Sequence, residues 1–158
     1  MSNGNGQCVE YTPTNYILTY DVNAPSGVAV SNQPASLSVT VTAGTSYTLA
    51  SAPTATGYTF NGWYCKDASN NSICTDSNNT AINCAASSSI TMPESDVICA
   101  GQWDVNTITL LWLPDGGTPN PITTPDSCVY GQSNGITGIS QPQKPGYSFD
   151  GWEVTNWQ

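Results

Sequence analysis

A seven-residue aromatic motif occurs twice in this chain, and its repetition constrains the fold more than any other feature. GYTFNGW at residues 57–63 returns as GYSFDGW at residues 146–152, with five identities and two conservative changes. A proline-containing segment precedes each copy, at residues 52–56 and 141–145. Because one motif in register at a fixed spacing, here 89 residues, indicates tandem units, we expect two related modules in series. The motif residues of greatest structural weight are Gly57, Tyr58, Phe60, Gly62, Trp63, Gly146, Tyr147, Phe149, Gly151 and Trp152.

A second alignment supports a period close to 90 residues. The corresponding pairs, each 91 residues apart, are Cys8 and Cys99, Asn15 and Asn106, and Ile17 and Ile108. We therefore expect residues 1–14 to be the tail of a preceding repeat or a linker, and residues 15–105 to be a complete β module. Residues 106–158 are expected to form a second module that lacks its terminal strand. An unpaired strand edge is the predicted consequence.

The composition favours a mostly β fold, α+β at most. With 14 Gly, 11 Pro, five Trp and eight Tyr, the chain mixes strand-forming aromatics with turn-forming residues. Residues 36–42 alternate polar and apolar side chains, which is typical of a half-buried strand, and residues 16–22 read as another strand. Residues 46–51 are expected to be a short helix or a single turn. Each module should contain about four strands and at most one short helix.

Charge and residue types exclude several classes of function. The chain has two Lys, eleven acidic residues and a net charge of −9, which argues against nucleic acid and anionic membranes as partners. It has no His, so His-dependent catalysis and His-ligated metals are excluded. Carboxylate pairs such as Asp150 with Glu153, or Asp96 with Asp104, are candidates for glycoside hydrolysis. Isolated turn aspartates are the preferred interpretation, so we expect no catalytic residues and no cofactor.

Two Asp/Asn-rich stretches are candidates for calcium binding. Residues 67–71 and 76–79 carry oxygen ligands, but they lack the Asp spacing and the closing Glu of an EF-hand loop. Solvated loops are the preferred interpretation, and we expect no metal site.

Six cysteines predict disulfides and an oxidising, extracytoplasmic environment. They are Cys8, Cys65, Cys74, Cys84, Cys99 and Cys128. The gaps between them do not fit the paired spacing of a zinc site. Six cysteines allow 15 pairings, so the sequence leaves the connectivity open, although the cluster from Cys65 to Cys99 suggests local loops. The chain has no apolar run of transmembrane length and no signal-peptide pattern, and we expect any signal or anchor to lie outside it.

The aromatic residues divide into core and surface candidates. Alternation places Tyr58, Phe60, Tyr147 and Phe149 in the core. The candidates for stacking against a glycan are Tyr64, Trp112 and Trp157, because flat aromatic faces suit the apolar faces of sugars.

The motifs together resemble the internalin-type B repeat, also called the Listeria/Bacteroides repeat of bacterial surface proteins. The resemblance rests on TAGTSYTL at residues 42–49, the aromatic motif at 57–63, the MPESDV turn at 92–97 and a terminal Gln102-Trp103. It implies small β-grasp-like modules in tandem on extracellular stalks and adhesins, without catalytic residues. The cysteines and the long loop at residues 66–88 depart from the usual pattern of the family.

The sequence therefore predicts a non-catalytic spacer or adhesive segment of a bacterial surface protein. One alternative is a glycan-binding module that uses exposed Trp and Tyr. Another is a subunit that assembles head to tail, in which residues 6–13 of one chain supply the missing strand of the next, with Cys8 and Cys128 closing the join. Expected partners are neighbouring repeats, other copies of the chain, and host or cell-wall glycans or surface proteins.

Overall fold

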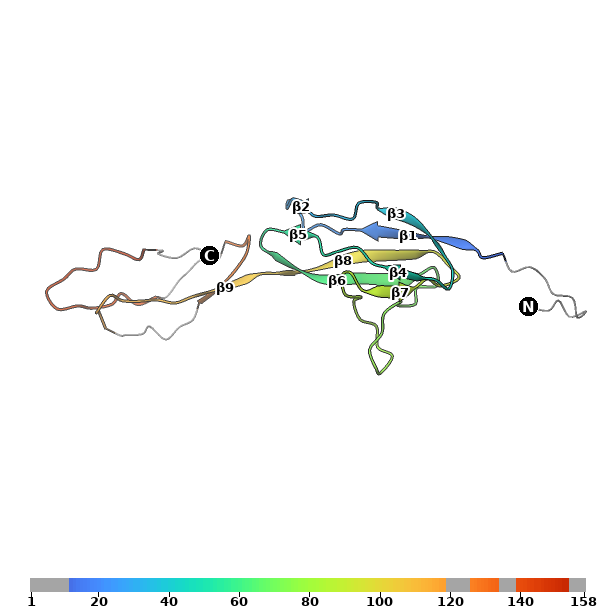
Figure 1. Cartoon of the computed structure of the whole chain (residues 1–158). Coiled ribbons are helices and arrows are strands. Elements are labelled where there is room, and N and C mark those ends of the chain that lie inside the picture. The colour runs from blue at the N-terminus through green and yellow to red at the C-terminus, as the bar shows by residue number, and fades with distance from the viewer. Residues whose placement is uncertain (1–11, 119–125, 134–138, 154–158) are drawn as a thin grey trace, which may run out of the picture. The chain divides into compact units, whose positions relative to one another are not determined.

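A computed structural model describes residues 12–118, 126–133 and 139–153 (Figure 1). The chain divides into two compact units, unit 1 at residues 1–104 and unit 2 at residues 105–158. The described residues contain strands and turns but no helix, so the prediction of a mostly β protein is confirmed. The strands are β1 (Asn15–Asp21), β2 (Val30–Ser31), β3 (Ser38–Thr42), β4 (Ser46–Thr48), β5 (Thr54–Ala55), β6 (Tyr58–Asp67), β7 (Ser89–Thr91), β8 (Val97–Val105), β9 (Thr107–Leu110) and β10 (Asp126–Val129).

Six of the described strands form one sheet, in the order β2-β5-β6-β8-β1-β3. The first long strand, β1, pairs antiparallel with β3 on one side. On its other side β1 pairs parallel with β8, the last strand of the sheet, from Leu18 opposite Val97 to Asp21 opposite Ala100. Strand β8 therefore lies in the middle of the sheet, between β1 and β6, as Figure 1 shows.

Alternating side chains explain how these strands form their core. Leu18 and Tyr20 of β1 and Val97 and Cys99 of β8 point to the same buried face, while the residues between them face outward. Strand β6 breaks this alternation at Gly62 and Trp63, which are both buried. Gly62 has a φ of 107°, and this local irregularity turns the Trp63 side chain into the core.

Residues 46–51 do not form the helix or isolated turn that we expected. Ser46–Thr48 is strand β4, which pairs antiparallel with β7 at Ser89–Thr91. This partner strand is distant in sequence and supplies the hydrogen bonds that a helix would otherwise supply locally. The buried cluster joins side chains near this ladder to those of the main sheet. It comprises Leu18, Tyr20, Val41, Leu49, Trp63, Cys65, Cys84, Ile90, Met92, Val97 and Cys99.

Unit 2 has a sparser framework among its described residues. Strands β9 and β10 pair antiparallel, from Thr107 opposite Val129 to Leu110 opposite Asp126. A single bridge joins Thr118 to Gln143. The second copy of the aromatic motif, residues 146–152, lies in turn and irregular backbone, whereas the first copy continues into strand β6.

Candidate functional site

Unit 1 contains a cluster of aromatic side chains in mutual contact around Trp63. Trp63 is fully buried, and its ring meets Tyr20 at a centroid distance of 4.8 Å and Phe60 at 5.0 Å, both edge to face. Phe60 in turn meets Trp103 of β8 at 5.0 Å. Such pairs stabilise a core beyond the area that they bury. The cluster thus joins strands β1, β6 and β8.

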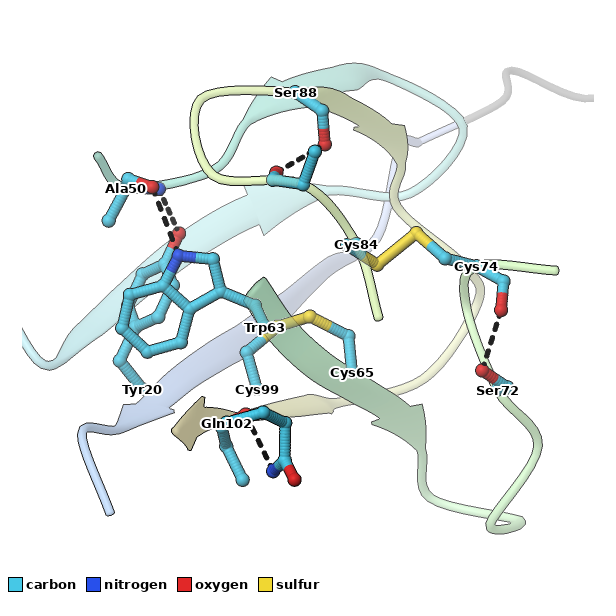
Figure 2. The surroundings of a disulfide bond; sticks show 12 residues. Tyr20, Ala50, Trp63, Cys65, Ser72, Cys74, Cys84, Ser88, Cys99 and Gln102 are labelled. Carbon is cyan, nitrogen blue, oxygen red and sulfur yellow. Dashed lines mark hydrogen bonds between the residues drawn. A yellow bond between two sulfur atoms is a disulfide. The ribbon is translucent and has the colours of Figure 1, made fainter. Parts of the chain in front are cut away.

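Both polar atoms at the centre of this cluster bind the backbone of Ala50 (Figure 2). The indole Nε1 of Trp63 donates to the Ala50 carbonyl at 3.0 Å, and the Ala50 amide donates to the Tyr20 hydroxyl at 2.9 Å. Burial raises the pKa of Tyr20 far above its ordinary value, so the phenol is neutral at physiological pH. These two bonds satisfy groups that would be costly to leave unpaired.

Strand β8 is seated in the sheet by contacts that require glycine at position 101. A Cβ on Gly101 would lie 2.5 Å from the Val22 carbonyl oxygen and 3.3 Å from the Phe60 ring. The Gly101 carbonyl accepts a hydrogen bond from Asn23 Nδ2 at 3.0 Å, and Trp103 Nε1 donates to the Val22 carbonyl at 3.0 Å. Sequence reasoning did not single out Gly101. Its one signal was a position two residues before an aromatic in a strand-like segment.

Two disulfides join described cysteines, and both lie beside the aromatic cluster (Figure 2). Cys65–Cys99 links strand β6 to its neighbour β8. Cys74–Cys84 joins two residues within the loop at residues 66–88, and Cys84 forms a two-way backbone bridge to Trp63, with both N···O distances 2.8 Å. Cys128 is half-buried with a free thiol, and Cys8 lies outside the described residues.

Unit 2 contains the same aromatic cluster with fewer members. Phe149 and Trp152 meet at 5.2 Å and 67°, against 5.0 Å and 66° for Phe60 and Trp63. Trp112 meets Trp152 at 5.0 Å, as Tyr20 meets Trp63. Trp112 therefore occupies the place of Tyr20, at an offset of 92 residues.

The backbone supports this offset, which is one residue larger than the alignment near residue 108 predicted. Asn23 and Asp115 are separated by the same offset, and both have positive φ, 48° and 43°. One difference between the clusters is polar: among the described residues, the buried Nε1 of Trp112 has no hydrogen-bond partner. In unit 1 the corresponding Tyr20 hydroxyl is paired with Ala50.

A groove of about 510 Å³ lies next to the unit 2 cluster. Its walls come from two segments, residues 113–117 and 147–153, with Pro142 and Lys144 between them in sequence. Tyr147 is 72% exposed at this groove, so the prediction that it belongs to the core is wrong. Its counterpart Tyr58 is half-buried, because β6 forms part of a complete sheet there.

A second groove, of about 400 Å³, lies on the outward face of the unit 1 sheet. Tyr64, one of the predicted ligand-contact aromatics, lines it together with the exposed Ile98. Lys66 Nζ lies 5.1 Å from the Tyr64 ring centre and donates to Asn70 Oδ1 at 2.8 Å. Of the other two predicted contacts, Trp112 packs edge-on against Trp152, and Trp157 lies outside the described residues.

The Asp-rich stretches of the loop form ordered turns. Asp67 Oδ1 accepts backbone N–H bonds from Ser69 and Asn71, at 2.9 and 2.8 Å. Asp76 Oδ1 accepts bonds from Asn78 and Thr80 in the same way, at 2.9 and 2.8 Å. Hydrogen bonding lowers the pKa of both carboxyls below the ordinary value. The side chain of Asn71 contributes most at Asp67, and the backbone amide of Thr80 contributes most at Asp76. The carboxylates serve as turn acceptors here.

The candidate catalytic carboxylates fall in different settings. Asp150 and Glu153 both line the unit 2 groove. Asp96 Oδ1 accepts the backbone N–H of Ile17 at 2.8 Å, while Asp104 is exposed in β8. Within the described ranges, no group of three or more His, Cys, Asp or Glu residues is arranged to hold a metal ion. No helix in the described part of the chain is long and apolar enough to cross a membrane.

The repeated ring geometry agrees with a comparison against known families. The chain matches the Listeria-Bacteroides repeat domain over residues 16–97 and again over residues 109–156, one match for each unit. No curated protein and no solved structure matches the chain. The two matches cover most of the chain and confirm the resemblance that the aromatic motif indicated. The chain belongs to the Listeria-Bacteroides repeat family.

Proposed function

We propose that the chain is a non-catalytic, force-bearing spacer or adhesive stalk segment of a bacterial cell-surface protein, in which such modules follow one another in tandem. The observation that carries this proposal is the parallel pairing of β1 with β8 in unit 1. These are the first and the last strands of the sheet, so the chain's two connections to the rest of the molecule leave from adjacent strands. Membership in a repeat family supports the tandem arrangement.

Parallel end strands give the module a favourable loading direction. A pull on the chain before Asn15 and after Val105 would draw β1 and β8 past each other along their length. All the ladder bonds from Leu18–Val97 to Asp21–Ala100 are then loaded together, and no single pair can open first. Forced unfolding is governed by the height of the unfolding barrier, which this geometry raises.

A first and last strand that pair in parallel at the middle of the sheet also support the β-grasp-like classification. The described part of unit 1 departs from that fold in having no helix. The β4–β7 ladder contributes neighbouring residues such as Leu49 and Met92 to the core, in the place that a helix would cover.

The disulfide between Cys65 and Cys99 limits how far unit 1 can extend. It joins β6 to β8, so a pull on the two ends passes through the S–S bond and leaves the 34-residue segment between the cysteines unloaded. Two disulfides also fit an oxidising location outside the cytoplasm.

Single-molecule pulling on the whole chain, held at its two ends, tests the proposal. We expect unit 1 to unfold in one cooperative step after unit 2. Complete reduction should lengthen that step by about 120 Å, because it releases the 34-residue segment at about 3.5 Å for each residue. Unit 1 opening gradually at low force would contradict the force-bearing role.

Single disulfide variants provide the controls. Removing only Cys65–Cys99, with Cys65→Ser and Cys99→Ser, should lengthen the step by about 85 Å, because the 10-residue separation of Cys74 and Cys84 stays closed. Removing only Cys74–Cys84 should leave the step unchanged, since that loop lies inside the protected segment.

The groove beside Tyr64 favours glycan binding as a second candidate function. An aromatic ring with an apolar neighbour, Ile98, and polar groups at its rim, Asp67 and Asn70, provides the chemistry that a sugar needs. A glycan array with the oxidised chain tests it, followed by titration of each hit against Tyr64→Ala. Tyr147→Ala is the matched control in the other unit. Binding that survives Tyr64→Ala, or no binding across the array, rejects this candidate.

A further inference from the structure

The groove on the outward face of unit 1 lies behind the disulfide that joins β6 to β8. Cys65 and Cys99 are paired across the two strands with their Cα atoms 3.9 Å apart, and both side chains are buried in the core (Figure 2). Because successive side chains on a strand point to opposite faces, the residues on either side of each cysteine face outward. These four neighbours, all of which line the groove, are Tyr64, Lys66, Ile98 and Ala100. The disulfide therefore fixes the spacing of the two rows that form the groove.

We propose that this groove binds a 2-acetamido sugar, an N-acetylhexosamine unit of a neutral glycan. The acetamido group combines a methyl group, an N–H donor and a carbonyl acceptor without a net charge, and the groove has a counterpart for each. The inference rests on the glycan-binding candidate proposed for this groove and names the class of sugar. It is independent of the spacer role.

Ile98 and Ala100 are the counterpart of the methyl group. Ile98 is 61% exposed, although Val97 and Cys99 on either side of it are fully buried. Ala100 points to the same face as Ile98, about 6.6 Å further along the strand. A methyl group placed here removes apolar surface from water, whereas a hydroxyl placed here would lose hydrogen bonds to water. The floor of the groove thus favours the acetamido sugar over a plain hexose.

Lys66 is the donor for the carbonyl oxygen of the acetamido group. Its Nζ lies 5.1 Å from the Tyr64 ring centre and donates to Asn70 Oδ1 at 2.8 Å. This bond uses one of the three N–H donors of the ammonium. Asn70 belongs to a turn that Asp67 stabilises by accepting two backbone N–H bonds. The ammonium is therefore positioned before a ligand arrives, which lowers the entropic cost of binding.

Asp96 is the acceptor for the N–H of the acetamido group. It lines the groove immediately before β8 and, two positions before Ile98, belongs to the same outward row. Its Oδ1 accepts the Ile17 backbone N–H at 2.8 Å, which orients the carboxylate. Its Oδ2 has no hydrogen-bond partner among the described residues. A ligand N–H that donates to this oxygen forms a charge-assisted hydrogen bond.

The charges at the groove favour a neutral sugar over an ionised one. One ammonium and two carboxylates, those of Asp67 and Asp96, line the groove, and the chain has a net charge of −9. An acidic sugar would be repelled by this arrangement. A sugar with a free amine would keep a bond to Asp96 but would lack the methyl group for Ile98 and the carbonyl for Lys66. The acetamido group alone uses all three contacts.

A binding titration of the full oxidised chain with three β-linked sugar trimers tests the assignment. The trimers of N-acetylglucosamine, glucosamine and glucose share one linkage and differ only in the group on the second ring carbon. We expect saturable binding of the N-acetylglucosamine trimer, with amide NMR shifts at residues 64–70 and 96–100. The other two trimers should bind at least tenfold more weakly, since even one missing methylene in an apolar site is worth about tenfold.

Matched variants of the protein locate the site. Ile98→Ala should weaken binding of the N-acetylglucosamine trimer about tenfold. Ile82→Ala shortens another exposed isoleucine that does not line the groove, and it should leave binding unchanged. Asp96→Asn keeps an oxygen for the Ile17 amide but removes the charge, so it should also weaken binding. If a variant unfolds unit 1, the three trimers still decide the matter without altering the protein.

The outcomes separate this inference from the glycan-binding candidate itself. Equal binding of the glucose trimer, lost on Tyr64→Ala, overturns the acetamido assignment and leaves glycan binding at the groove in place. Equal effects of Ile98→Ala and Ile82→Ala overturn it as well. If neither the trimers nor any glycan on the array binds, both the acetamido assignment and the glycan-binding candidate are wrong.

Discussion

Units 1 and 2 carry the same aromatic motif in different surroundings, and the pair separates local from long-range causes of structure. The Phe–Trp ring pair has nearly the same distance and angle in both units, because its two members are close neighbours in sequence. Burial differs: Trp63 is fully buried, while Trp152 is half-exposed. The motif therefore sets its own ring geometry, and the neighbouring strands determine how much that geometry stabilises the unit.

Replacing the central tryptophan of each unit gives the largest expected contrast. Trp63→Ala should destabilise unit 1 by about 5 kcal/mol, because a large buried ring and its bond to Ala50 are lost together. Trp152→Ala should cost unit 2 about 1 kcal/mol, since the ring is half-exposed. Hydrogen exchange followed by mass spectrometry measures each unit separately. Equal losses in the two units would remove the proposed role of the covering strands.

Removing the disulfides should lower the stability of unit 1 and so reduce the difference in stability between the two units. In the chain-entropy view, losing Cys65–Cys99 costs about 4 kcal/mol and losing Cys74–Cys84 about 3 kcal/mol, because the first closes the longer loop. Urea denaturation of the two double-serine variants checks these values. Cys128→Ser is the control and should leave unit 1 unchanged. The opposite ranking of the two disulfides would show that strain or packing outweighs loop length.

Adding a single Cβ to the glycine immediately before the motif tryptophan tests the same comparison between the two units. Gly62→Ala should cost about 3 kcal/mol, from backbone strain at a φ of 107° and from a Cβ only 2.6 Å from the Cys84 carbonyl oxygen. Gly151→Ala should cost about 1 kcal/mol, since its φ is 138° but no described neighbour lies within 4 Å of the added Cβ. Thermal denaturation of both variants tests the difference, and a larger effect at Gly151 would refute it.

Acidification should produce the smallest effect, confined to the loop at residues 66–88. The pKa of Asp67 and of Asp76 is lower in the folded chain than in the unfolded one. Their contribution is therefore complete at neutral pH and is lost as pH falls below about 4, through the ordinary carboxyl range and then the lowered folded pKa. Amide NMR shifts of Asn71 and Thr80 report the loss. Asp67→Asn should abolish the pH dependence of the first turn alone.

Much of unit 1 was predictable because strand-like residue patterns are visible within the individual segments of its sequence. The alternation at residues 36–42 predicted β3, and the strand expected at residues 16–22 is β1. Strand β4 was not predictable, since its three residues become a strand only through pairing with β7, far away in sequence. The exposure of Tyr147 was missed for a related reason. Its repeat position suggested burial, but burial depends on strands outside the motif.

The groove in unit 2 could not be located from the sequence, because its walls come from residues 113–117 and 147–153, and contacts between distant segments cannot be read from the motif alone. Gly101 was overlooked because its role is a close approach to the Val22 carbonyl, and a close approach between distant segments leaves no periodic pattern. Asn23 and Asp115 both have a positive φ, and this shared backbone conformation shows that the two positions correspond in the repeat.

The parallel arrangement of β1 and β8 also determines how much reach one module adds. Parallel strands run in the same direction, so the chain comes into unit 1 at one end of the sheet and leaves it at the other. Strand β8 has nine residues, which corresponds to a span of about 30 Å. An antiparallel end pair would return the chain to its starting side and add almost no length. The points at which the chain enters and leaves the sheet of unit 1 therefore lie about 30 Å apart, a separation that side-chain changes on its surface leave intact.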